Sequence, residues 1–593
     1  MTTYRQRAAK EIATAHPAES VGPIMRGLVR DSAAMLQRSP ADARARAAAA
    51  RDDAIGRLEE LHSQVRANFA SRGIGYHRAA TAAEAVATVR ALLGDARRVA
   101  KSKTMVGEEV GLTHGLREVG IDVLETDIGE YIVDVEGRGP SHITAPALHL
   151  NRARIRDLLA RTGAELEDDD PGRLSRYVRD VVGAYFQACD AGITGANAVV
   201  ASSGRVVIVE NEGNVSLGVS HPRLHIVITG LEKVVADEAG ALAILEVLAP
   251  SATAQPLTAF THFLADPAPG QQRHVVFVDN GRSRVLRDRR FREVLKCIRC
   301  GACMNACPVY RVAGGLSYGS PYMGPIGAVL SPLLWRDGRF ADLPGASSLC
   351  GRCTEVCPVG IPLHRMLLDL RADSVSRGKS GGIGERAAWR AWATAFSGAT
   401  RARAVTALAR IGLRNGARLV RPRGGSADPR MLPEPDVTRD PAMLQAAAPG
   451  YSVGPVLVDL LLDTPTAGLE ALFRERASLL GVEVVTAMDE RLGDHRLRAA
   501  AGVASTGSVL LLADATPRRP LLAAKRVVVE LDPGEIVRYP SDLAGRLGDG
   551  EALILTGASR TADIEKQIVR GIHGAEEMVV VLKSADGRGS GAG

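Results

Sequence analysis

Seven of the chain's eight cysteines lie in one short segment, and this clustering limits what the segment can fold around. Two motifs, CIRCGACMNACP and CGRCTEVCP, carry them: Cys297, Cys300, Cys303, Cys307, Cys350, Cys353 and Cys357. A C-x2-C-x2-C-x3-C-P run wraps three thiolates around one corner of a cubane iron–sulfur cluster, and its last cysteine ligates another cluster. Because a cytosolic chain of this length needs no disulfide staples, the clustered thiols indicate metal or redox chemistry.

The spacing predicts how the thiolates divide between two [4Fe-4S] clusters. Cluster 1 is expected to take Cys297, Cys300, Cys303 and Cys357. Cluster 2 is expected to take Cys307, Cys350 and Cys353, one thiolate short of a full set, since Ser347 stands where the second motif would have its first cysteine. The second site is therefore a [3Fe-4S] cluster or a four-iron cluster with an oxygen, water or exogenous fourth ligand.

Zinc is the main alternative for this segment, because two CxxC pairs can form a tetrahedral four-thiolate site. Zinc would leave three cysteines unused, and it would not explain Pro308 and Pro358, which follow the last cysteine of each motif. Cys189, in the apolar stretch VVGAYFQACD, is expected to be an ordinary core cysteine.

The rest of the chain alternates helical patterns with short apolar strands, which indicates an α/β fold on a mainly parallel sheet. AVVASSGRVVIVENEGN from Ala198 resembles AGVASTGSVLLLADATP from Ala501, so we expect two related α/β domains flanking an α-helical, ferredoxin-type cysteine module. The expected parts are a helical segment (1–75), an α/β domain (76–285), the iron–sulfur module (286–375), a helical segment and linker (376–450), a second α/β domain (451–585) and a flexible tail (586–593).

Composition excludes several classes of function. The net charge of +7 is small for 593 residues, and aromatic residues make up only 4%, so nucleic-acid binding is not expected. No window approaches the about 18–20 apolar residues of a membrane span, and the first residues lack the apolar core of a secretory signal. We expect a cytoplasmic protein without transmembrane segments, and peripheral membrane association through a partner stays open.

Three polar stretches outside the cysteine module are candidate ligand sites. The first has acids and histidines that either act in acid–base chemistry or cap and pair at a sheet edge: Glu125, Asp127, Glu130, His142 and His149. The second, the ENEGN loop at 210–214, follows a strand, where open α/β sheets bind ligands, or is a plain turn. The third, GASRTADIE at 557–565, is expected to open a helix whose start could bind an anion. No catalytic residue is assigned, and no NAD or flavin site is recognised.

Taken together, the motifs resemble a known family. CIRCGACMNACPVYR, GGLSYGSPYMGPIGAVLSPLL and SSLCGRCTEVCPVGIPLH, with SKTMVGEEVGL, ETDIGEYIVDV, PSHITAPALH, VENEGN, TGLEKVV and VDNGRS upstream, resemble the lactate-utilisation iron–sulfur protein (LutB-type) over about residues 60–375. From about residue 450, above all in LTGASRTADIEKQIVRGIHG, the chain is similar to the companion LutC-type protein, which is normally separate. The chain thus looks like a fusion of the two.

The resemblance implies an electron-transfer subunit of a complex that oxidises L-lactate to pyruvate, rather than a complete enzyme. It also implies two four-iron clusters on the same seven cysteines, flanking domains with the fold of sugar isomerases and CoA-transferases, and a separate cysteine-rich partner subunit. The clusters would pass electrons toward a quinone or another carrier. Departures from the family pattern include Leu316, Ala558 and Ala575, and the last two bear on any ligand site in the C-terminal domain.

Three other functions stay open. The clusters could serve another 2-hydroxyacid or a thiol-linked oxidoreductase. The α/β domains could form a transferase or isomerase in which the clusters are structural. The module could also be a regulatory scaffold without turnover.

Overall fold

The computed structural model describes residues 2–376, 383–398, 401, 403, 468–486, 496–512, 524–564 and 568–583. The chain forms two compact units, one of residues 1–370 with 463–593 and one of residues 371–462. The described part of the second unit contains the end of α18 (Leu363–Ser376) and α19 (Ile383–Ala395), which exposes Trp389 and Trp392. In the described residues, none of the helices is both long and apolar enough to cross a membrane.

The first unit begins with four helices: α1 (Tyr4–Ala15), α2 (Pro17–Leu36), α3 (Ala43–Gly56) and α4 (Leu58–Ser71). Thr3 and Gln6 form a capping box at the start of α1, and Pro17 occupies the first position of α2, where its missing N–H costs nothing. Helix α3 packs on α12 (Glu238–Thr253), and α2 packs on both α12 and the cysteine module. The N-terminal helices therefore join the α/β part to the cysteine module.

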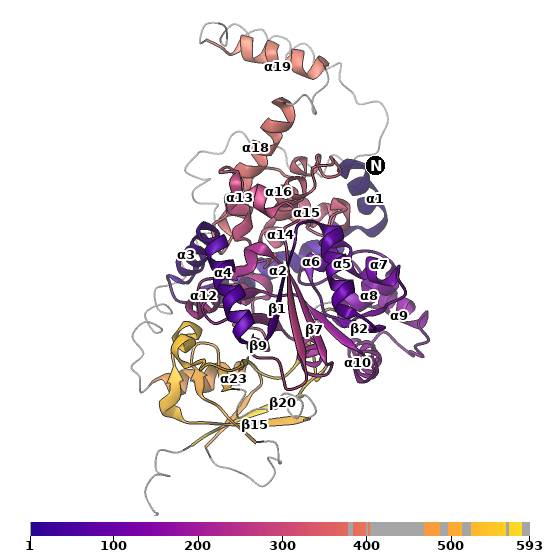
Figure 1. Cartoon of the computed structure of the whole chain (residues 1–593). Coiled ribbons are helices and arrows are strands. Elements are labelled where there is room, and N and C mark those ends of the chain that lie inside the picture. The colour runs from indigo at the N-terminus through magenta and orange to yellow at the C-terminus, as the bar shows by residue number, and fades with distance from the viewer. Residues whose placement is uncertain are drawn as a thin grey trace, which may run out of the picture. The chain divides into compact units, whose positions relative to one another are not determined.

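A parallel six-stranded sheet follows, in the order β1 (Ile74–Ala79), β10 (Gln272–Val278), β7 (Leu224–Gly230), β4 (Ala191–Thr194), β2 (Arg98–Lys101) and β3 (Asp122–Glu125). Its helical connections are α5 (Ala82–Leu93), α6 (Met105–Val110), α7 (Leu112–Arg117), α8 (Ile128–Glu136), α9 (Arg152–Ala160), α10 (Pro171–Gln187) and α11 (Asn214–Ser220). Helices α4 and α5 lie beside β1 (Figure 1). Strands such as Val275–Val278 are fully buried, as expected for a parallel sheet with covered faces. The predicted α/β class is confirmed.

A second, eight-stranded sheet joins four strands from residues 198–264 with four from residues 501–555. Its order is β16 (Ile536–Val537), β13 (Ala501–Val503), β14 (Ser508–Leu512), β17 (Ala552–Leu555), β9 (Phe260–Leu264), β6 (Val206–Glu210), β5 (Ala198–Val200) and β8 (Val234–Val235). The C-terminal part adds α23 (Leu469–Leu479) and a four-stranded sheet of β11 (Glu483–Val485), β20 (Glu577–Leu582), β15 (Arg526–Leu531) and β12 (Arg496–Arg498), in orange and yellow in Figure 1.

The eight-stranded sheet is built from two copies of one arrangement. The repeat seen in the sequence forms the hairpins β5–β6 and β13–β14, and β8 and β16 pair in parallel with the outer strand of each hairpin. Strands β9 and β17 pair antiparallel, with His262 opposite Leu553, Phe263 opposite Ala552 and Thr261 opposite Ile554. This register relates the copies by a pseudo-twofold axis between His262 and Leu553. The sequence predicted two related parts but not that they share a sheet.

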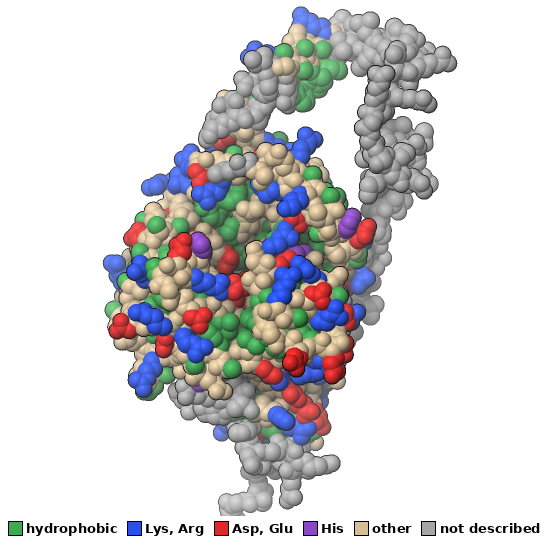
Figure 2. Space-filling model, turned by 90° about the vertical axis from the view of Figure 1, so that its right-hand side faces the viewer, with side chains coloured by type: hydrophobic (Ala, Val, Ile, Leu, Met, Phe, Trp, Pro, Cys, Tyr) green, Lys and Arg blue, Asp and Glu red, His purple; other side chains and the backbone are tan. Residues whose placement is uncertain are grey.

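The cysteine module, which lies between the two α/β parts in the sequence, consists of short helices. They are α13 (Arg282–Arg287), η2 (Arg292–Lys296), α14 (Ala302–Ala306), α15 (Pro308–Ala313), η3 (Leu316–Tyr318), α16 (Gly324–Leu334), η4 (Leu343–Gly345) and α17 (Arg352–Glu355), followed by α18. Its cysteines, except the exposed Cys350, pack in the same hydrophobic core as α2 and α12. On the face shown in Figure 2, basic and acidic side chains are interspersed, which is not the basic stripe of a nucleic-acid surface.

Candidate functional site

The structure brings the seven clustered cysteines into two groups. Burial raises the pKa of the Cys303 thiol well above its ordinary value, and the nearby Cys297, Cys300 and Cys357 raise it further. In the other group, burial and then Cys307 and Cys350 raise the pKa of Cys353 to about 11. Cys357 thus joins the first motif and Cys307 joins the second. The spacing predicts the same grouping, and ligation itself stays a prediction.

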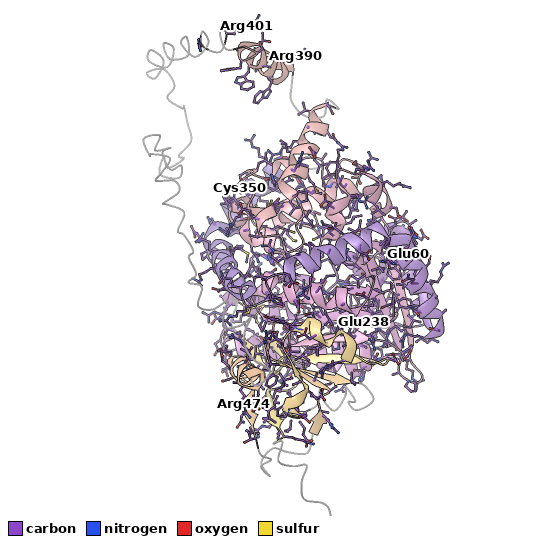
Figure 3. The ribbon with its side chains drawn as sticks, turned by 90° about the vertical axis from the view of Figure 1, so that its left-hand side faces the viewer. Glu60, Glu238, Cys350, Arg390, Arg401 and Arg474 are labelled. Carbon is purple, nitrogen blue, oxygen red and sulfur yellow. The ribbon has the colours of Figure 1, made fainter. Side chains whose placement is uncertain are left out.

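The surroundings of these thiols fit iron–sulfur clusters. Five of the seven are buried, Cys297 is half-buried and Cys350 is exposed, at the edge of the ribbon in Figure 3. Backbone N–H groups point at the sulfur atoms: Arg299 N lies 3.4 Å from Cys297 Sγ, and Ile361 N lies 3.4 Å from Cys357 Sγ. Such donors stabilise thiolate and cluster sulfur, and they tune the reduction potential of a bound cluster. Cys189 lies half-buried outside both groups.

A cavity of about 790 Å³ opens beside the loop of Cys297 and Cys300. Its wall includes helix α2, the carboxyl ends of β2, β4, β6 and β7, the end of α12, the loop residues Ile298 and Arg299, and the C-terminal residues Arg560–Asp563 with Ile568. Ligands of open α/β sheets bind at the carboxyl ends of strands, so this is the expected edge of the sheet. The cysteine module and both α/β parts therefore line the same cavity.

Two of the predicted ligand segments and part of the third meet in this cavity. Asp127, the ENEGN residues Glu210–Glu212 and Asn214, and Arg560–Asp563 all line it. The backbone connects them directly, since Arg560 N donates to Asn211 O at 2.8 Å and His573 N donates to Glu212 O at 2.8 Å. No helix begins in residues 557–564, so that prediction is wrong: Arg560–Thr561 instead forms β18, paired with β19 (Val569–Arg570).

Three carboxylates lie together on the cavity wall. Oxygen atoms of Asp127, Glu212 and Asp563 lie within 4.8 Å of one another, close enough to hold a cation. Lys103 Nζ donates to Asp127 Oδ2 at 2.9 Å and supplies positive charge there. Burial, followed by the charges of Asp127 and Asp563, raises the pKa of Glu212 well above its usual range. Glu212 therefore tends to hold a proton, which reduces the repulsion within the group.

The other acids and histidines of the first candidate stretch do not line the cavity. Glu125 pairs with Lys101 at 2.8 Å, and Lys101 is fully buried. Burial, and then Glu108 and Glu125, raises the pKa of Glu130 well above its ordinary value. His149 contacts Glu136 at 2.8 Å, and His142 contacts Asn305 of the cysteine module at 2.9 Å.

Asp127 and Glu210 both line the cavity, and each also forms hydrogen bonds within the protein. Asp127 caps α8 by accepting from Glu130 N at 3.2 Å, and it also lines the cavity. Although burial raises the pKa of Glu210, hydrogen bonds from His262 and Ser216 bring it below its ordinary value. His262 Nε2 lies 2.7 Å from Glu210 Oε1, so this buried pair fixes the start of the ENEGN loop.

Sequence reasoning missed the basic and hydroxyl groups of the cavity. Arg299 and Lys233 line it beside the Cys297–Cys300 loop, and Lys233 Nζ donates to the Cys297 carbonyl at 3.2 Å. Burial and the neighbouring Arg299 lower the pKa of Lys233 to about 7. Arg299 lies within CIRCG and Lys233 within TGLEKVV. Both motifs were recognised in the sequence, but the basic residue in each was not identified as a candidate ligand-binding group.

A buried ion network ties the remaining motifs together. Arg282 donates to Glu109 at 2.7 Å and to Glu232 at 2.6 Å, and all three side chains are buried. Tyr322 of the cysteine module donates to Glu109 at 2.5 Å. These residues come from VDNGRS, SKTMVGEEVGL, TGLEKVV and GGLSYGSPYMG, so motifs far apart in sequence form one joint between sheet and module.

Comparison with known proteins also separates an α/β part from a cysteine module. Residues 63–281 match the LUD domain model, and residues 293–361 match the 4Fe-4S dicluster domain model. Lactate utilization protein B of Geobacillus thermodenitrificans is 43% identical over 351 residues, which cover 58% of this chain and 74% of that protein. The Bacillus thuringiensis protein of the same name is 42% identical over 357 residues, covering 59% and 75%.

A solved structure, a DUF162 family protein from Deinococcus radiodurans, matches 37% of this chain and 97% of its own, with 18% identity and a TM-score of 0.21. The family models show an α/β LUD domain and a 4Fe-4S dicluster module, which favours iron–sulfur clusters over zinc. Residues beyond 361 lie outside both matched models.

Proposed function

The chain belongs to the family of lactate utilization protein B, and from this we propose that it is the iron–sulfur electron-transfer subunit of a complex that oxidises L-lactate to pyruvate. One observation carries the proposal: the group of Cys297, Cys300, Cys303 and Cys357, with backbone N–H donors on Cys297 and Cys357, lies beside a cavity at the carboxyl edge of the LUD sheet. A redox group at such a place can take electrons from a molecule bound next to it.

We propose that Cys297, Cys300, Cys303 and Cys357 hold cluster 1, and that Cys307, Cys350 and Cys353 hold cluster 2. The mutual pKa effects within each group support this division. Bound [4Fe-4S] clusters supply one-electron redox chemistry. The chain's own residues hold the thiolates, donate N–H groups to sulfur and exclude water from cluster 1, while exposed Cys350 leaves one side of cluster 2 near solvent.

We propose further that the C-terminal part is a LutC-like α/β domain fused to the LutB-type part, with the fold of sugar isomerases and CoA-transferases. The shared sheet and the repeated hairpin support this relation. The parts of the chain would end at residues 75, 285, 375, 450 and 585, as expected from the sequence. A cysteine-rich partner subunit, a quinone or carrier as acceptor, and a cytoplasmic location complete it.

The first test is anaerobic purification followed by iron and sulfide assays and EPR spectra before and after dithionite. Two four-iron clusters predict about eight iron atoms per chain and a reduced cubane signal. Cys300→Ala should abolish the cluster 1 signal and Cys353→Ala the cluster 2 signal. Cys189→Ala is the matched control and should change neither. Zinc without acid-labile sulfide would contradict the proposal.

The substrate is tested with the reconstituted complex. L-lactate should reduce the clusters faster than other 2-hydroxyacids or thiols, as followed by bleaching of the cluster absorbance. Lactate ranking last would favour the other donors. A transferase or isomerase with structural clusters instead predicts activity that survives Cys300→Ala in a folded protein, and a regulatory scaffold predicts no electron uptake from any reduced donor.

A further inference from the structure

The two cysteine loops share one backbone conformation. In the first loop, Arg299 and Gly301, on either side of Cys300, have φ values of 64° and 78°. In the second, Leu349 and Gly351, on either side of Cys350, have φ values of 56° and 81°. Left-handed φ is rare for residues with side chains such as Arg299 and Leu349, so the match aligns the two loops residue for residue.

The alignment places Ser347 where the first loop has Cys297, and the local contact is the same. Arg299 N donates to Cys297 Sγ at 3.4 Å, and Leu349 N donates to Ser347 Oγ at 3.1 Å. The Ser347 oxygen therefore stands, relative to its loop, where the first loop holds a thiol. The group of Cys307, Cys350 and Cys353 is the one that lacks a fourth thiol.

We propose that Ser347 is the fourth protein ligand of cluster 2 and binds iron through its side-chain oxygen. The iron–oxygen bond forms as the hydroxyl loses its proton to solvent, which reaches the exposed Ser348 and Cys350, and no electron is exchanged. An alkoxide is a harder ligand than a thiolate and favours ferric iron. Cluster 2 therefore has a lower reduction potential than the same site with four cysteines. This assignment rests on the proposed clusters.

The test uses the full chain, purified without oxygen, with three variants. Ser347→Ala should increase, several-fold over wild type, the three-iron EPR signal that appears after brief oxidation. Ser347→Cys should suppress this signal and raise the cluster 2 potential in a redox titration. Ser348→Ala, the exposed neighbour, is the matched control and should behave as wild type.

Cluster 1 provides an internal reference, because its signal should be the same in all variants. If Ser347→Ala and Ser347→Cys both match wild type in three-iron signal and potential, Ser347 is not a ligand. If wild type contains no iron or sulfide, the proposed function itself fails, and the two failures are thereby distinguished.

A second inference concerns the cavity. Three polar side chains in its wall keep buried atoms without a hydrogen-bond partner among the described residues: Thr229 Oγ1, Arg299 Nη1, and Nε and Nη2 of Arg560. Thr229 is 1% exposed and the Arg299 side chain 10%. Buried donors of this kind are costly unless a ligand satisfies them.

The unpaired donors and the rest of the wall indicate the chemistry of the ligand. Arg560 has two unpaired guanidinium nitrogens, Nε and Nη2, and such a pair of N–H donors matches a carboxylate. Arg299 offers only Nη1, because its Nη2 pairs with Glu232 at 3.2 Å. Apolar side chains, among them Leu28, Val106 and Ile568, form other parts of the wall and suit an organic group. The volume of about 790 Å³ exceeds what a three-carbon acid requires.

We infer that the cavity binds a 2-hydroxy or 2-oxo carboxylic acid, with Arg299 and Arg560 as cationic partners and Thr229 as a hydrogen-bonding partner. The ligand lies beside the Cys297–Cys300 loop. This assignment deepens the proposed function and rests on it for the class of acid. The C-terminal residues complete the site, because Arg560 belongs to the fused part.

Binding is measured by calorimetry on the anaerobic protein with oxamate, an unreactive analogue of pyruvate, and with 2-oxohexanoate. One molecule should bind per chain, and 2-oxohexanoate several-fold more tightly. Arg560→Gln and Thr229→Val should each weaken binding about tenfold, the loss expected when a buried partner is removed. Arg570→Gln, on the paired strand β19 but not in the cavity wall, is the matched control.

Cluster spectra recorded on the same samples separate the outcomes. No binding by a protein with reducible clusters overturns the cavity assignment and leaves electron transfer intact. Equal weakening by Arg560→Gln and Arg570→Gln also overturns it. Inorganic phosphate binding as tightly as oxamate would replace the carboxylic acid with a general anion and overturn the stated class.

Discussion

The two α/β parts of the chain share a strand order but bury different kinds of residue. In the first part, β1, β10, β7 and β4 stand in the order that β11, β20, β15 and β12 repeat in the C-terminal part. The first part continues through β2 and β3, which arise from residues 80–190. Only residues 486–495 separate β11 from β12, so the second part has no room for these strands.

Residues at equivalent positions of the two copies differ in charge and in hydrogen bonding. His262, which contacts Glu210, lies opposite its equivalent, Leu553. Arg205, whose carboxylate partner is Glu238 at 3.1 Å, corresponds to Ser508 in the repeat. The first part carries buried polar pairs at the cavity and the cysteine module. At these two positions the C-terminal part has the uncharged residues Leu553 and Ser508, and it contributes packing plus the short Arg560–Asp563 segment.

The largest expected effect comes from the buried ion network of the first part. Arg282→Met leaves Glu109 and Glu232 buried without this cation, and breaking such a pair costs about 3–5 kcal/mol of unfolding free energy. Urea unfolding followed by circular dichroism measures the loss. Adding Glu109→Leu should recover part of it, because one buried charge is removed as well. A double variant no more stable than Arg282→Met would contradict this account.

The next effect tests whether the C-terminal part is integral to the fold. Ile554 is fully buried in β17, and Ile554→Ala should cost about 2–5 kcal/mol through lost burial and a cavity. Both parts should unfold in one transition, since β17 and β9 share a ladder. Leu479→Ala, exposed on α23, is the control, with a change within about 0.5 kcal/mol. Two separate transitions would show that the parts fold independently.

A smaller effect depends on pH at the junction. Burial lowers the pKa of His573 to about 4; the charge of Arg179 lowers it further, and the charges of Glu210 and Asp180 oppose the change. The unfolded chain binds a proton near its ordinary pKa of 6.5 and the folded chain only near 4, so stability is lost as pH falls from 6.5 to 4. The loss reaches about 3 kcal/mol. His573→Phe should flatten this part of the pH–stability curve, and an unchanged slope would assign it to other groups.

The smallest effect is a surface control in the C-terminal part. Arg526 and Glu577 pair on neighbouring strands with side chains 41% and 59% exposed. Arg526→Gln should change the unfolding free energy by less than about 1 kcal/mol, because exposed ion pairs contribute little. A loss as large as that of Arg282→Met would remove the contrast between the two parts.

Sequence reasoning identified features that leave a local pattern. Cysteine spacing predicted the two thiol groups. The Ala198 and Ala501 repeats predicted two related α/β parts, and in the structure these repeats form two matching hairpins. The pairing of β9 with β17 left no such trace, because FTHFL and ALIL each resemble any buried strand. Arg560 was expected near a helix start, but its bond to Asn211 O extends the chain instead. Tertiary contacts, rather than propensity, decide these cases.

The shared sheet also has a genetic consequence. The two copies of the repeated arrangement lie in one chain, so they are made in equal amounts. Every cysteine module is therefore synthesised together with its own Arg560–Asp563 segment and needs no encounter with a second chain. Each copy can also change without imposing the change on the other, which a homodimer cannot do. The two residues at the pseudo-axis already differ: Leu553 is a packing residue, whereas His262 contacts Glu210 at 2.7 Å.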